Sequence, residues 1–200
     1  MGIHNNGKKD LLWNYYLTLS KELSDISNYI EFDKANYSTY SIELAKLLMS
    51  ASSEVDVVMK QLCHSLNKKR KPKNINDYKT IIKADQIKTI FINEAVLIPR
   101  HGLELHPWSN WKGSSNPEWW TAYNNVKHER NNHFAKATLK NTINAMGALL
   151  ICIVYLRATE RMPQHNDGDY KEAIAWAWGE LSPRDMFLQL DRVAYPLLRT

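Results

Sequence analysis

The sequence of 200 residues has few cysteines and glycines, and it lacks the motifs that are typical of disulfide-linked, metal-binding or phosphate-binding proteins. Its two cysteines, Cys63 and Cys152, lie in apolar periodic segments and match no metal-ligand spacing, which favours reduced thiols in a cytoplasmic protein. Its seven glycines form no phosphate-binding loop, and no zinc-protease motif or nucleophile elbow is present. The histidines and acids show no ligand set paired four residues apart on one helix. We therefore expect neither a cofactor nor a bound metal.

Targeting and membrane signals are also missing. The segment MGIHNNGKKD lacks the apolar core of a secretory signal, and Asn6 stands where a myristoylation motif has Ser or Thr. The longest apolar run, Ala145 to Leu156, is too short to span a bilayer. We expect one cytoplasmic domain over residues 1–200 with no membrane contact. The net charge of +5 permits nucleic-acid binding without requiring it.

Apolar residues recur at three- and four-residue steps, a pattern that predicts an all-α bundle. The clearest pattern is a heptad seam suited to antiparallel packing: Ala45, Leu48, Ser52, Val55, Met59, Leu62 and Leu66. The sequence beyond Leu139 is apolar nearly all round, so that helix should be central. The main helices are expected over about residues 8–30, 39–66, 77–90 and 117–160, with short helices within 170–190.

Two segments break the helical pattern. In residues 91–116, two short apolar stretches flank Pro99 to Gly102, which predicts a small irregular or β-hairpin insertion. From Lys68 to Lys73, five of six residues are cationic and the sixth is proline, which predicts a loop. That loop is either a solvated turn or a patch that contacts phosphate.

The start of the helix predicted over 117–160 concentrates polar and aromatic side chains. At helical spacing, Trp120, Asn124 and His128 share one face, and Lys127 and Arg130 lie beside them. Metal-free RNA cleavage needs a base, an acid and cations that stabilise the phosphorane charge. His128 is therefore a candidate acid or base, and Lys127 and Arg130 are candidate phosphate-holding cations.

The same stretch offers candidate binding residues. Trp120 or Tyr123 could stack on a base, and Asn124 and His133 complete the polar set. The structural alternative is that these groups tie the helix to its neighbours and pair with Glu54, which stands directly beside the heptad seam.

Two stretches of the sequence resemble the HEPN superfamily, small helical proteins common in bacterial toxin–antitoxin and phage-defence systems. One is AKLLMSASSEVDVVMKQLC, with Glu54 placed where such domains often have an acid. The other is WWTAYNNVKHERNNHFAKATLKNTINAMGALLICIVYL, with Trp-Trp, Tyr-Asn and Lys-His-x-Arg before a last long helix. The resemblance implies a bundle of four to five main helices that forms a homodimer, with an RNA site across the dimer interface. It further implies a metal-independent ribonuclease of toxin or phage-defence type, with an antitoxin-like protein as a candidate partner.

The HEPN catalytic motif is an arginine, a polar residue and a histidine several positions later. Arg130 and Asn131 match its opening, but His133 follows Arg130 after only two residues. Arg100 and His106 have five residues between them, yet lie in a loop region. Members without the motif resemble non-catalytic partners or nucleotide and RNA binders. The alternative function is thus a non-catalytic dimeric interaction or nucleic-acid-binding module, and a third is a nucleotide-binding helical protein that acts beside a transferase.

Overall fold

The computed structural model describes residues 10–162 and 170–191, which are mainly helical. The α-helices are α1 Leu11–Ile26, α2 Ile42–Leu66, α3 Ile75–Ala84, α4 Lys88–Asn93, α5 Glu118–His128, α6 Arg130–His133, α7 Leu139–Arg161 and α8 Tyr170–Glu180. Short 3-10 helices are η1 Lys34–Asn36, η2 Pro99–His101, η3 Ser109–Lys112 and η4 Phe134–Lys136. A small antiparallel sheet contains β1 Val96–Ile98, β2 Leu103–Leu105 and β3 Gln189–Leu190.

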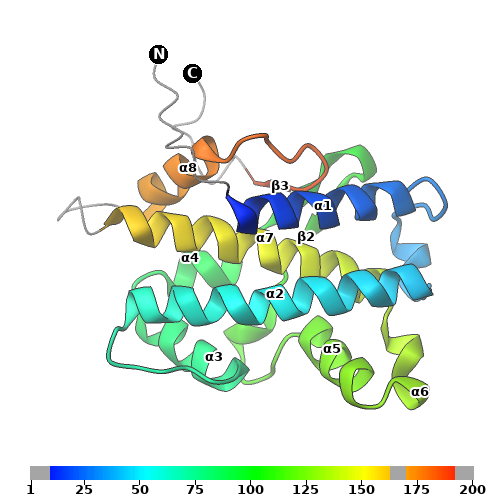
Figure 1. Cartoon of the computed structure of the whole chain (residues 1–200), viewed down its shortest axis with the longest axis horizontal. Coiled ribbons are helices and arrows are strands. Elements are labelled where there is room, and N and C mark those ends of the chain that lie inside the picture. Colours follow the sequence, from blue (N-terminus) through cyan, green and yellow to red (C-terminus); the bar gives the residue numbers. More distant parts are fainter. Residues whose placement is uncertain (1–9, 163–169, 192–200) are drawn as a thin grey trace.

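Helices α2 and α7 pack along each other and form the centre of the molecule (Figure 1). The heptad seam predicted on α2 is confirmed, because its residues from Ala45 to Leu62 are buried and Leu66 is half-buried. The Ser41 side chain caps α2 by accepting a hydrogen bond from the backbone N–H of Leu44. Between the two helices, the Thr142 hydroxyl donates to the Leu44 carbonyl oxygen at 3.1 Å, which satisfies a buried polar group.

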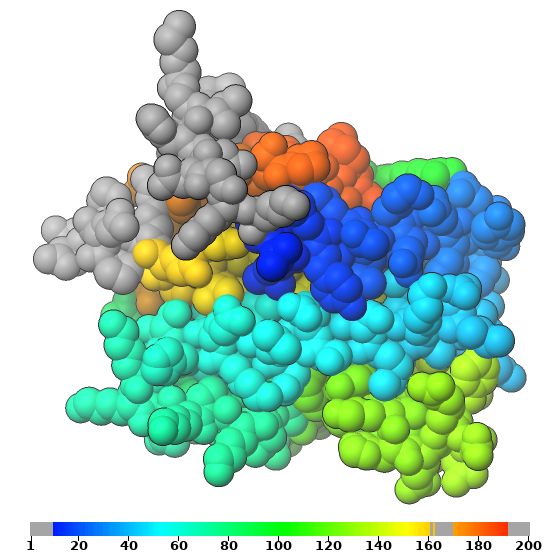
Figure 2. Space-filling view, in the orientation of Figure 1, coloured from blue at the N-terminus to red at the C-terminus, as the bar shows by residue number. Residues whose placement is uncertain are grey.

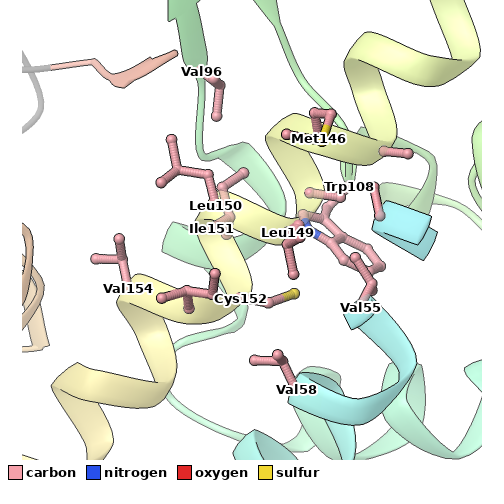
Figure 3. Close-up of a cluster of buried hydrophobic side chains, with 14 of the residues drawn as sticks. Val55, Val58, Val96, Trp108, Met146, Leu149, Leu150, Ile151, Cys152 and Val154 are labelled. Carbon is pink, nitrogen blue, oxygen red and sulfur yellow. The ribbon is translucent and has the colours of Figure 1, made fainter. Parts of the chain in front are cut away.

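Helix α7 is buried on nearly every side, as its apolar sequence predicts. Figure 3 shows Leu149 and Cys152 of α7 facing Val55 and Val58 of α2, while Val96 of β1 lies on the opposite side of α7. By length and composition alone Leu139–Glu160 could cross a bilayer, but 89% of its most apolar stretch is buried inside the structure. That burial is typical of the core helix of a globular bundle.

The predicted hairpin is confirmed. Val96 of β1 pairs with Leu105 of β2, and Ile98 pairs with Leu103. The connection turns at Gly102, whose φ of 61° lies in the left-handed region that glycine enters without a Cβ clash. The sequence did not indicate the third strand, β3, which places Leu190 opposite Val96.

Of the short helices expected within 170–190, only α8 forms among the described residues. A second helix after Ser182 is not present, and residues 182–188 are irregular. The buried carboxylate of Asp185 instead holds this segment against α1. It accepts hydrogen bonds from the hydroxyls of Tyr16 and Ser20, each at 2.7 Å. The Trp13 indole N–H donates to the Pro183 carbonyl oxygen at 2.9 Å. These bonds satisfy polar groups that a helix would leave unpaired in the core.

Two predicted helices are divided in the structure. The helix expected over 77–90 becomes α3 and α4, because Asp85 adopts an extended conformation and its side chain accepts from the Ile87 N–H at 3.0 Å. The helix expected over 117–160 becomes α5, α6, η4 and α7. It is interrupted at Glu129, with φ −138° and ψ 58°, and restarts at Thr138, whose hydroxyl caps α7 through the Asn141 N–H at 3.2 Å.

Candidate nucleic-acid interface

The candidate site is the segment Lys127–His133, which we call the basic turn. Helix α5 ends at His128, and Glu129 leaves the helical conformation. Its carbonyl oxygen then accepts from the backbone N–H groups of Asn132 and His133, each at 3.0 Å, so that α6 is a single turn. Figure 2 shows α5 and α6 as a projecting block beside α2. Residues 127–132 of this turn are exposed to solvent, and His133 is half-buried.

Three of the predicted site residues lie together on this turn. Lys127, His128 and Arg130 are exposed, and none has an acidic partner within the part of the chain that the structure describes. Residues 127–132 line a shallow depression that is open to solvent. The arrangement places the His128 imidazole near two cations that form no ion pair, while the exposed carboxylate of Glu129 lines the same depression. Two cations against one acid leave the turn with an excess of positive charge, which attracts phosphate.

His133 is also part of the turn, but it is paired. Its Nε2 atom lies 3.5 Å from Oε2 of Glu129, and the imidazole side chain is 31% exposed. The expectation that no histidine and acid are paired four residues apart is therefore wrong for Glu129 and His133, whose spacing in the sequence already indicates the pair. No cluster of three or more metal-ligating side chains occurs in residues 10–162 and 170–191.

The aromatic candidates are inside the protein. Trp120 is 7% exposed and Tyr123 is 4% exposed, so neither ring offers a face on which a base could stack. Their rings contact each other with centroids 5.5 Å apart, and the Lys127 ammonium lies 5.4 Å from the Tyr123 ring centroid. Asn124, half-buried, donates from Nδ2 to the Trp120 carbonyl oxygen at 3.0 Å. These three residues therefore support the turn and do not form its outer surface.

Glu54 is half-buried on α2, and burial raises the pKa of its carboxyl above the ordinary value. Among the described residues its carboxylate has neither an ion pair nor a hydrogen bond. The structural alternative required Glu54 to pair with His128 or Arg130, and that pair is not formed.

The other basic residues considered in the sequence lie away from the basic turn. Arg100 and His106 belong to the hairpin region, where His106 Nε2 is 2.9 Å from Oε1 of Glu104. The run Lys68–Lys73 follows α2 at the end opposite the basic turn (Figure 1). A helix of 25 residues is about 37 Å long, so this loop and the basic turn are separate surfaces.

Comparison of the chain with protein-family models, with curated proteins and with solved structures finds no match. The resemblance to HEPN proteins thus rests on the two sequence stretches that carry it.

Proposed function

We propose that this protein binds RNA at the basic turn and cleaves it without a metal ion, in the manner that its HEPN resemblance implies. The observation that carries the proposal is the exposure of Lys127, His128 and Arg130 on one turn, where neither cation forms an ion pair with any of the described residues. Exposed cations at one turn bind the phosphodiester backbone by charge, and a neighbouring histidine side chain can act as a general acid or base.

The reaction that these groups suit is internal transesterification. A base removes the proton of the ribose 2′-hydroxyl, the 2′-oxygen attacks the adjacent phosphorus, and the P–O5′ bond breaks as the leaving oxygen gains a proton. His128 is the base or the acid, while Lys127 and Arg130 stabilise the charge on the phosphorane oxygens. In the homodimer that the resemblance implies, a second His128 would perform the complementary proton transfer.

The experiment is RNA cleavage in excess EDTA, with analysis of the product ends. The expected products are a 2′,3′-cyclic phosphate and a 5′-hydroxyl. Arg130→Ala and Lys127→Ala should each reduce cleavage at least tenfold, because one charge-assisted phosphate contact contributes about 1.5–3 kcal/mol. Lys88→Ala, which removes an exposed lysine of α4, is the control for loss of a charge. Equal cleavage rates for the wild-type protein and all three variants would overturn the proposal.

The openness of the turn favours a second candidate, a non-catalytic RNA-binding module. Residues 127–132 line a shallow depression and not a closed pocket, so the site does not exclude water as many catalytic sites do. In that case RNA binding depends on Lys127 and Arg130, but the RNA is recovered intact.

A further inference from the structure

Tyr40, which precedes α2, lies near the basic turn although it is far from it in the sequence. The segment before α2 is held against the start of α7, because the Leu139 N–H donates to the Thr39 carbonyl oxygen at 2.8 Å and Tyr40 forms an isolated β-bridge with Thr138. Figure 1 shows the beginning of α2 and the α6 turn at the same end of the molecule. Residues that are far apart in sequence thus form one surface.

The Tyr40 ring is oriented toward both the turn and solvent. It meets the Phe134 ring edge-on, with centroids 5.9 Å apart and an interplanar angle of 87°. Phe134 directly follows His133, the last residue of the basic turn. Tyr40 is 51% exposed, so the Phe134 contact orients its ring while much of it remains open to solvent.

The charge around Tyr40 favours a nucleic acid over an apolar protein partner. Arg130 and Lys136 are exposed within a few residues of Phe134, and neither has an ion pair in the described residues. Ile42, 74% exposed, is the large aliphatic neighbour in sequence, while Glu43 is engaged by Lys46 at 2.9 Å. A half-exposed ring that contacts a segment carrying exposed cations suits single-stranded nucleic acid, in which bases and phosphates alternate along the strand.

We infer that Tyr40 is a base-stacking residue for single-stranded RNA whose phosphates lie on the basic turn. The inference rests on the proposed function, because it assigns a base contact to the strand that Lys127 and Arg130 hold by its phosphates. Tyr40 performs the role for which Trp120 and Tyr123 are too deeply buried. Phe134 acts as a positioning residue, since it sets the angle of the Tyr40 ring.

The test is fluorescence anisotropy with a labelled single-stranded oligonucleotide, 2′-O-methylated so that it cannot be cleaved, and with an abasic oligonucleotide of the same length and charge. Tyr40→Leu should weaken binding of the first about tenfold, since one base stack is lost, and should not change binding of the second. Tyr40→Trp should retain the wild-type affinity. Tyr15→Leu, which removes a 42% exposed tyrosine of α1, is the matched control and should bind as the wild type does.

Each outcome is decisive. If Tyr40→Leu binds both oligonucleotides as the wild type does, or loses affinity for both equally, the stacking inference is wrong. If it instead abolishes self-association in light scattering while RNA binding persists, Tyr40 is a contact between copies of the chain, and the inference is also wrong. Wild-type binding that Arg130→Glu leaves unchanged would overturn the proposed function itself. Binding that depends on Arg130 but not on Tyr40 would overturn the stacking inference alone.

Discussion

The Nε2 atom of His133 lies 3.5 Å from Oε2 of Glu129, and this pair spans α6, the one-turn helix that carries Arg130. Glu129 is the acid of the basic turn, and its negative charge would repel the phosphate of the proposed RNA ligand. An amide at this position could still accept a hydrogen bond from His133. The carboxylate therefore pairs with His133 and lowers the positive charge of the turn.

We predict that Glu129→Gln strengthens RNA binding about twofold to threefold at low salt, because it removes a like charge beside the phosphate. The gain should shrink as salt rises, since screening weakens exposed charge interactions. Anisotropy titrations at two salt concentrations measure it, with Glu180→Gln on α8 as the control. Weaker binding by Glu129→Gln would show that the negative charge supports the site through His133.

Glu54 is predicted to make stability depend on pH. Burial raises its folded pKa above the ordinary carboxyl value near 4.3, so the folded state holds this proton more tightly than the unfolded state does. The contribution of Glu54 to stability therefore falls as pH rises through that raised pKa. Glu54→Gln should raise Tm at pH 7.5 and leave it nearly unchanged at pH 4. A Tm difference that is independent of pH, like that expected for exposed Glu172→Gln, would refute this prediction.

Both thiols should be inert in the folded protein. Burial raises the pKa of Cys63 to about 12, and it raises the pKa of Cys152 above the ordinary thiol range. Since the thiolate is the reactive form, a disulfide reagent at pH 8 should label neither residue in native protein and both in denaturant. Labelling of either thiol faster than global unfolding would contradict the packing of α2 against α7.

Asp185 should be a stability residue. Asp185→Ala leaves the buried hydroxyls of Tyr16 and Ser20 without their acceptor, at a cost of about 2–4 kcal/mol. Asp185→Asn retains an acceptor oxygen and should cost less. Urea unfolding measures both variants. If Asp185→Ala and Asp185→Asn have the same free energy of unfolding, the hydrogen bonds to Asp185 do not hold the segment against α1.

The sequence predicts those parts of the fold in which one residue pattern decides the structure. The seam from Ala45 to Leu62 repeats regularly enough to identify α2 and its buried face, and Pro99 to Gly102 between apolar stretches identifies the hairpin. Strand β3 has two residues and exists only because β1 is next to it, so no local pattern could reveal it.

Part of the candidate site could be predicted from the sequence, and part of it depends on tertiary contacts. The cluster of Lys127, His128 and Arg130 is visible in the sequence as adjacent polar residues, and the structure shows that all three are exposed. Their functional role stays a prediction. The stacking role predicted for Trp120 depends on a helix face that it shares with Asn124 and His128. That face is buried at Trp120, near the start of α5, and reaches solvent only at His128, where the helix ends. Tyr40 could not be predicted, since its relation to Phe134 is made by tertiary contacts across the bundle.

The central claim is that His128 transfers a proton during RNA cleavage. Its most direct test is the single-turnover cleavage rate in EDTA with the protein at saturating concentration, which separates the chemical step from binding. His128→Ala should lower that rate by about 10²–10⁴, the usual contribution of general acid–base catalysis. The matched control is His64→Ala, which removes an exposed histidine of α2 and should cleave at the wild-type rate. Equal rates for His128→Ala and His64→Ala would contradict the claim.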